Sequence, residues 1–283
     1  MHLLKLLILE RTPIHQLKRS PFAPLLTKPI IKHFLTTCAD GCLDPSILTV
    51  QSDQLLPYRL NLDVWGEDLT YWDLNQTSRK GVSLVLQLNL SGHFRAALNR
   101  TIVKEDLDPL RPYGHPARGG RFPTLAWCRM DLDLDHRVAL IEEIQSDLIR
   151  DLQALRCQAN KARKAEQESF RYFGADFSTF HFLQFYEETV LPLERIWSEA
   201  MLTASLRFLM REIGIGDIYY HTPQTGAFLK RIEGPQPPRS LYTQLPRKFC
   251  FAQTSDAPER LIDGRRLRQA RKRQSVHFYK LAT

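Results

Sequence analysis

Two adjacent carboxylates follow the most apolar strand pattern of this sequence. The run Val138-Ala-Leu-Ile141 predicts a buried strand, and Glu142 and Glu143 come directly after it. Carboxylates in such a place lose water, so they must be paired, hydrated or protonated. A carboxylate of raised pKa could act there as a general base, and Gln145 and Asp147 complete the polar segment. The alternative is a strand end that reaches solvent, with Asp147 as a helix cap.

The alternation of side chains along a strand divides this segment between two faces. Period-two geometry places Glu143, Gln145 and Asp147 on one face and Glu142, Ile144 and Ser146 on the other. We therefore expect Glu143 to be the base and the remaining polar groups to support it.

A second strand pattern, 217–222, carries groups that could act as a general acid. It contains Tyr219 and His221, and it could lie beside the strand of Glu143 in the sheet. We include both in the candidate catalytic set. The alternative is a pair of core aromatic residues and one histidine with its hydrogen bonds satisfied.

A loop rich in Pro, Gly and Arg spans residues 108–123. Arg111, Arg118 and Arg121 could hold an anion there. Guanidinium groups form bidentate hydrogen bonds with phosphate, and glycines let the backbone approach the anion. No phosphate-loop or dinucleotide motif is present, and a mobile surface loop is the alternative.

The remaining pattern predicts a mixed α/β fold with a central mixed sheet flanked by helices. We expect these elements: strands at 82–90, 125–132, 137–145, 217–222, 240–243, 248–252 and 276–281, and helices at 93–100, from Ser146 or Asp147 to about 173, at 193–213 and at 223–232. The predicted organisation is an irregular N-terminal region packed on the core (1–80), an α/β domain (81–255) and a basic C-terminal tail (256–283).

The net charge of +8 is concentrated at the two ends of the chain. Residues 260–283 carry eight Lys and Arg against one acid, Asp263. A basic end can contact nucleic acid or an acidic protein partner, or it can be a solvated tail. The candidate nucleic-acid-binding residues are Arg265, Arg266, Arg268, Arg271, Lys272 and Arg273.

Cysteine usage and hydropathy indicate a reducing, cytoplasmic setting. The five cysteines are odd in number and irregular in spacing, which argues against a disulfide framework. Cys38 and Cys42 with His33 do not follow a usual zinc spacing, so we expect no metal. No segment approaches the roughly 18 apolar residues that span a bilayer.

The segment around the carboxylates resembles a known motif. Leu140-Ile-Glu-Glu-Ile-Gln-Ser-Asp147 is similar to the signature of a domain found in large polyvalent proteins of phages and conjugative elements. Segments 197–207 and 241–249 are similar to later parts of that domain, so the resemblance covers about residues 110–250. It implies a mobile-element or conflict setting and no particular reaction.

The predicted order of elements resembles the core of the GNAT acetyltransferase superfamily. Hairpin, helix, strand, short helix and strand pair follow in that order, and 222–232, 241–242 and 249–251 resemble the later half of the fold. The resemblance implies acetyl-CoA between two parting strands, here 140–145 and 217–221. Its usual glycine-containing pyrophosphate loop is replaced by Gln145-Ser-Asp-Leu-Ile-Arg150.

These features together predict a group (acyl) transferase acting on a polar or nucleic-acid-linked substrate. The competing hypothesis is a binding module without catalysis that uses its basic C-terminal end. Hydrolysis is a third option.

Overall fold

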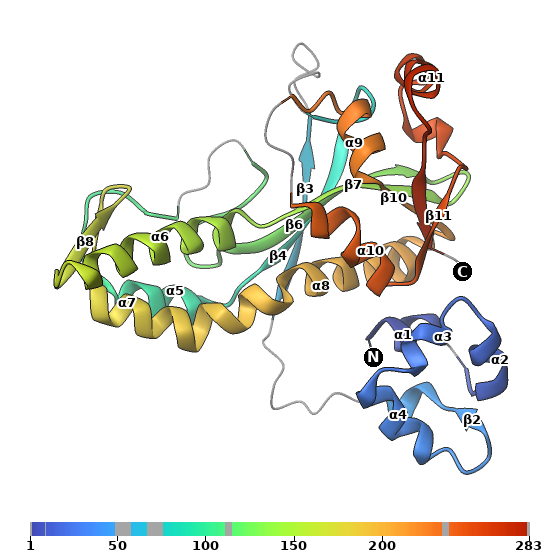
Figure 1. Ribbon diagram of the computed structural model, residues 1–283, viewed down its shortest axis with the longest axis horizontal. Coiled ribbons are helices and arrows are strands. Elements are labelled where there is room, and N and C mark those ends of the chain that lie inside the picture. The colour runs from blue at the N-terminus through green and yellow to red at the C-terminus, as the bar shows by residue number, and fades with distance from the viewer. Residues whose placement is uncertain are drawn as a thin grey trace.

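The chain folds into a mixed α/β structure with a large mixed sheet flanked by helices (Figure 1). The computed structural model describes residues 2–8, 10–48, 58–66, 76–110, 115–233 and 238–281. The predicted fold class is therefore confirmed.

Seven strands form the main sheet, in the order β11-β12-β10-β7-β6-β4-β3. They are β3 (Arg59–Trp65), β4 (Ser83–Asn89), β6 (Thr124–Asp133), β7 (Val138–Gln145), β10 (Asp217–His221), β11 (Phe251–Thr254) and β12 (Phe278–Leu281). Only β7 and β10 pair in parallel; the other neighbours are antiparallel. The predicted β6–β7 hairpin and the neighbouring position of β10 are confirmed.

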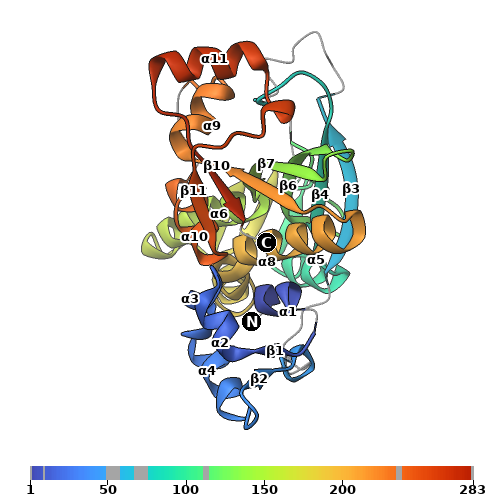
Figure 2. The same ribbon diagram turned by 90° about the vertical axis from the view of Figure 1, so that its right-hand side faces the viewer.

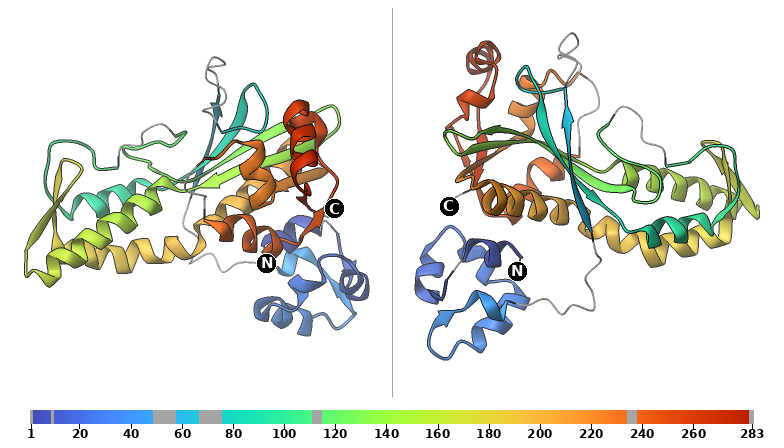
Figure 3. Two further views of the ribbon diagram at one scale, coloured as in Figure 1. Left: turned by 45° about the horizontal axis from the view of Figure 1, so that its top comes forward. Right: turned by 180° about the vertical axis from the view of Figure 1, so that it is seen from behind.

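Both faces of the sheet are covered, so alternate residues of its central strands enter different cores. Ile141 and Tyr220 pack in the larger core, whereas Leu140 and Tyr219 pack in a smaller one. The larger core is covered by α5 (Gly92–Asn99), α6 (Asp147–Lys164), α7 (Thr179–Phe185) and α8 (Leu191–Arg207), and the smaller one by α9 (Pro223–Leu229), the 3₁₀ turn η7 (Glu259–Leu261) and α11 (Gly264–Arg273). Figure 3 shows α8 running beneath the sheet.

Helix α6 is shorter than its sequence pattern predicts. It ends at Lys164, and a second sheet of order β5-β9-β8 follows, with β5 (Ile102–Glu105), β8 (Ser169–Tyr172) and β9 (Ala175–Ser178). The prediction of a helix to about residue 173 was wrong because Phe170 stacks on Phe177 and meets Phe182 edge-on, which fixes a hairpin there. Gly174 forms the hairpin turn with φ of 80°.

The next helix begins earlier than predicted. Helix α7, the π-helical turn η4 (Tyr186–Val190), α8 and the π-helical turn η5 (Phe208–Ile213) run on without interruption from Thr179, not from Leu193. Residues 240–243, predicted as a strand, instead form the end of the 3₁₀ turn η6 (Arg239–Tyr242). Helix α10 (Gln244–Lys248) then delays the next strand to Phe251, because Tyr242 and Leu245 turn inward at helical spacing.

The N-terminal residues form short elements interrupted by prolines, as their sequence predicts. These are α1 (His2–Leu7), β1 (Thr12–Pro13), α2 (Ile14–Arg19), α3 (Ala23–Leu26), α4 (Pro29–Thr36), β2 (Cys42–Leu43) and η1 (Pro45–Ile47). They pack against the end of the long helix, where Arg211 Nη2 donates to the Leu6 carbonyl at 2.6 Å (Figure 2). A boundary at residue 80 does not fit this arrangement, because β3 is a strand of the main sheet.

The C-terminal residues belong to the sheet as well. Strand β12 lies between β10 and β11, and α11 covers the smaller core beside α9. The predicted extra strand at 276–281 is present, but the segment 256–283 is not a separate tail. Among the described residues, no helix is long and apolar enough to cross a bilayer.

Candidate functional site

The candidate site lies where β7 and β10 part. Their parallel pairing runs from Val138 opposite Asp217 to Ile141 opposite Tyr220. Beyond that point β7 continues against β6, and His221 of β10 pairs with Phe278 of β12. The two strand ends therefore open a gap in the sheet, which the side chains of other elements must fill.

A β-bulge turns both glutamates to one face of the sheet. Arg129 lies opposite Glu143 but Met130 lies opposite Ile141, so Glu142 is the extra residue. Ile141 and Ile144 consequently pack in the same core although they are three positions apart, an odd number that normally places side chains on opposite faces. The strict alternation predicted for residues 142–147 is therefore wrong.

Glu142 is fully buried, and both oxygens of its carboxylate accept hydrogen bonds. Its carboxylate accepts hydrogen bonds from the Ser78 backbone N–H at 3.3 Å, from the Ser78 hydroxyl and from His221 Nε2 at 3.1 Å. Burial raises the pKa of Glu142, but His221 and the positive charges of Lys230 and Arg129 outweigh it, so the pKa lies below its usual range. Burial lowers the pKa of His221, although the charge of Glu142 and the hydrogen bond to it raise that pKa in part.

Lys230 is the residue that follows α9, and its side chain enters the gap between the strands. Its Nζ donates to the Glu142 carbonyl at 2.8 Å, at the point where the parallel ladder has stopped. The side chain is buried, and burial lowers the pKa of the Lys230 amine despite the neighbouring Glu143 and Glu142. A buried amine with a lowered pKa is a recognised feature of catalytic sites.

Glu143, predicted as the base, is held in an ion pair. Arg129 Nη2 donates to its carboxylate at 2.6 Å and to the Gln76 carbonyl at 2.8 Å. On the same face, Asp131 is buried and accepts from Arg79 Nη2 at 3.0 Å. Burial and the nearby Glu142 charge raise the pKa of Asp131 to about 7.

Gln145 and Asp147 belong to a different cluster, at the start of α6. Asp147 accepts from Trp127 Nε1 at 2.9 Å and from Gln145 Nε2 at 2.7 Å, and it lies 2.8 Å from His115 Nδ1. Burial raises the pKa of Asp147, but the hydrogen bonds from His115 and Trp127 lower it by a larger amount. The pKa of Asp147 therefore lies below its usual value. Ser146, not Asp147, caps the helix, by accepting from the Ile149 N–H at 3.1 Å.

The six predicted catalytic residues are thus not brought together. Glu142, Glu143 and His221 line the gap, whereas Gln145 and Asp147 lie beyond it. Tyr219 packs in the smaller core, with Lys280 Nζ 5.1 Å from its ring centre.

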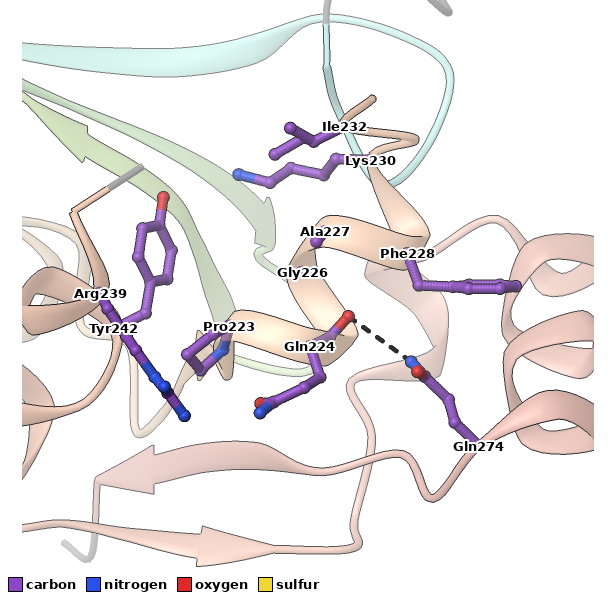
Figure 4. Close-up of a pocket in the computed structure, with 10 residues that line it drawn as sticks. All are labelled: Pro223, Gln224, Gly226, Ala227, Phe228, Lys230, Ile232, Arg239, Tyr242 and Gln274. Carbon is purple, nitrogen blue, oxygen red and sulfur yellow. Dashed lines mark hydrogen bonds between the residues drawn. The ribbon is translucent and has the colours of Figure 1, made fainter. Parts of the chain in front are cut away.

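A cavity of about 580 Å³ opens between α9 and η6, beside the gap (Figure 4). Lys230 and Tyr242 supply polar groups to its wall, and Lys230 Nζ lies 5.6 Å from the Tyr242 ring centre. In Figure 4 the amine end of Lys230 and the hydroxyl end of Tyr242 lie on the same side of the view, beside the strands. The Tyr242 hydroxyl is buried without a hydrogen-bond partner among the described residues, and burial raises its pKa well above 10.0. It is therefore a protonated donor at the buried end of Tyr242.

Sequence reasoning missed most of these gap residues. Arg129 has a signal, because an arginine in the apolar run of β6 requires an acidic partner. Lys230, Tyr242 and Ser78 carry no such signal in the sequence, because each of them lies far from Glu142 along the chain.

Two of the three arginines expected to bind an anion, Arg118 and Arg121, do not line this cavity. Arg111 lies outside the described residues. Arg118 lies 3.9 Å from Asp63, and Arg121 is exposed beside Phe122. The small hollow beside Arg118 is also lined by Asp147 and Asp151, which disfavour an anion.

One predicted nucleic-acid contact is ruled out by burial. Arg266 is 3% exposed, and its Nη1 donates to the Thr77 carbonyl at 2.9 Å and to the Leu229 carbonyl at 2.8 Å. These two hydrogen bonds connect α11 to the loop at 76–79 and to α9. The other five basic residues of the predicted set, Arg265, Arg268, Arg271, Lys272 and Arg273, are exposed.

Acetyl-CoA does not fit the place where the resemblance puts it. Lys230 already bonds the Glu142 carbonyl between the parted strands, and Asp147 sets a negative charge in the first turn of α6. The segment 145–150 also lacks a glycine that would let a pyrophosphate approach the backbone. In the part of the chain that the structure describes, no three His, Cys, Asp or Glu side chains converge on a metal site.

Comparison of the chain with models of protein families, with curated proteins and with solved structures yields no match.

Proposed function

We propose that this chain is a group-transfer enzyme that binds a short acyl donor and a polar acceptor in the cavity between α9 and η6. The observation that carries the proposal is the buried Lys230 amine beside the unpartnered Tyr242 hydroxyl at the wall of a cavity. Concave sites with a few convergent polar groups and a perturbed pKa are typical of enzymes.

The two polar groups suit acyl transfer from a thioester. In its unprotonated form, Lys230 takes the proton of the acceptor as the acceptor nitrogen or oxygen bonds to the acyl carbon. The carbon–sulfur bond breaks, and the proton passes from Lys230 to the departing thiolate. The Tyr242 hydroxyl donates a hydrogen bond to the acyl oxygen, where negative charge develops.

The carboxylates act here as positioning groups. Glu142 holds Lys230 through its backbone carbonyl, and its side chain ties β7 to His221 and to the 76–79 loop. Glu143 holds Arg129. This assignment replaces Glu143 with Lys230 as the base, and Tyr219 and His221 with Tyr242 as the hydrogen-bond donor.

The parting of the central strands gives further support. β7 and β10 pair in parallel and separate at their ends, as the resemblance to the acetyltransferases implies. The mobile-element setting stays a prediction from the sequence motif.

The test measures thiol release from S-acetyl-N-acetylcysteamine, a thioester without the nucleotide half of CoA. Adenosine, cytidine and n-butylamine serve as acceptors. We expect acceptor-dependent release that Lys230→Met lowers at least a hundredfold, the range of general-base effects, and that Lys164→Met on the exposed end of α6 leaves unchanged. Equal release by the wild type and the folded Lys230→Met protein would refute the proposal.

A second candidate, a binding module without catalysis, is favoured by the exposed basic residues of α11. It predicts no thiol release from any donor and a loss of partner binding only when α11 is changed.

A further inference from the structure

The exposed face of α11 carries a stripe of positive charge. Its sequence contains six basic residues and no acid, and Arg265, Arg268 and Lys272 recur at helical spacing on the exposed side. No acidic partner lies within ion-pair distance of these three among the described residues. We call Arg265, Arg268 and Lys272 the α11 stripe.

Helix stability alone does not account for the stripe. Cations in the last turn offset the helix dipole, which explains Lys272, and Arg271 pairs with Glu259 at 2.7 Å. Arg265, however, lies in the first turn, where the dipole disfavours a cation. Its exposed charge therefore indicates an external anion.

The C-terminal end of α11 borders the cavity. Gln274, the residue after α11, lines the cavity and donates to the Gln224 carbonyl at 3.5 Å (Figure 4). The Arg273 guanidinium lies 5.9 Å from the ring centre of Phe228, which also lines the cavity and points toward α11. Exposed Arg239 adds a cation to the cavity lining on η6.

We propose that the α11 stripe binds the phosphates of a single-stranded nucleic acid whose terminal nucleotide enters the cavity as the acyl acceptor. This inference rests on the proposed group transfer. The stripe spans about 10 Å along the helix axis, so its long side chains can reach neighbouring phosphates of one strand.

The combination at the cavity mouth favours nucleic acid over an acidic protein. A ring and a guanidinium, here Phe228 and Arg273, are the groups on which bases stack. An acidic protein would use the stripe but would not need the ring and the guanidinium at the cavity mouth. A duplex end would present its terminal base already paired and stacked.

The test measures binding of a 12-nucleotide oligothymidylate with a 5′ fluorescent label by anisotropy at several salt concentrations. One triple variant replaces the stripe: Arg265→Gln, Arg268→Gln and Lys272→Gln. A control removes the same charge from the end of α6 beside β8, on the opposite side of the molecule from α11 (Figures 1 and 3): Lys161→Gln, Arg163→Gln and Lys164→Gln.

For the wild type we expect log K to fall with log[salt] at a slope of about −2, from roughly −0.7 per phosphate contact. The stripe variant should bind roughly tenfold more weakly or worse at ~0.1 M salt, with a slope near zero. The control should match the wild type. Unchanged binding by the stripe variant, an equal loss in the control, or tighter binding of polyglutamate than of the oligonucleotide would overturn the inference.

The two proposals can fail separately. Thiol release with small acceptors but no oligonucleotide binding would remove the nucleic-acid substrate and leave the transferase. Stripe-dependent oligonucleotide binding without any Lys230-dependent release would remove the transferase and the role of the nucleotide as acceptor.

Discussion

Replacing Asp131 by Asn tests whether water is excluded from the sheet face around Glu142, as the burial of its carboxylates indicates. Asp131 is buried, it accepts a hydrogen bond from Arg79, and the Glu142 charge lies nearby. Asparagine keeps the size of the side chain and removes its charge. The comparison therefore isolates the cost of ionising a carboxyl group at this position.

The expected magnitude follows from the pKa of Asp131. Burial raises that pKa to about 7 from its ordinary 3.8, so between about pH 4 and pH 7 the folded chain holds a proton that the unfolded chain has released. The free energy of unfolding then falls by about 1.4 kcal/mol for each pH unit in this window. From pH 5 to pH 8 the wild type should lose roughly 3 kcal/mol through this group, and Asp131→Asn should not.

Urea denaturation followed by tryptophan fluorescence at pH 5 and pH 8 measures the difference. The stability of Asp131→Asn relative to the wild type should rise by roughly 3 kcal/mol between the two conditions, with an unchanged m-value. Asp135→Asn, in the exposed turn of the same hairpin, should differ from the wild type by no more than about 0.5 kcal/mol at both. Parallel pH dependences for Asp131→Asn and the wild type would refute the reasoning.

Two further substitutions test the packing around the site. Gly226→Ala should destabilise the fold by roughly 1–3 kcal/mol although alanine favours helices, because its Cβ would lie 3.0 Å from the Cβ of His221; Gly216→Ala, which meets nothing within 4 Å, is the control, and denaturation shows both. Trp127→Phe should cost about 1–3 kcal/mol by removing the indole donor of Asp147, and a variant as stable as the wild type would show that this bond contributes nothing.

The arrangement of the sheet follows from features that the sequence displays. Apolar runs separated by a polar turn define the β6–β7 hairpin, and a helical connection between two later strands favours the parallel pairing of β7 with β10. The amphipathic pattern identifies where α6 begins, because Ser146 precedes it as a cap.

The end of α6 and the bulge of β7 could not be predicted in the same way. Aromatic packing around Phe170 overrides the helical pattern, and a bulge depends on the partner strand, so Glu142 carries no local sign of it.

The composition of the site was predicted only in part. The sequence predicts that the strand of His221 lies beside the strand of Glu143, and the structure joins His221 to Glu142 at 3.1 Å. Lys230 lies 88 positions from Glu142 along the chain, and the contact arises only because α9 folds back across the gap. Such a residue cannot be assigned from local spacing.

The most direct test of the account is the titration of Lys230 by NMR of the lysine side chains, with Lys230→Met to assign its resonance. The account predicts that this amine titrates below its ordinary value of 10.5 and that its resonance shifts when S-acetyl-N-acetylcysteamine is added. An amine that titrates at or above 10.5, or one that does not respond to the thioester, would contradict it.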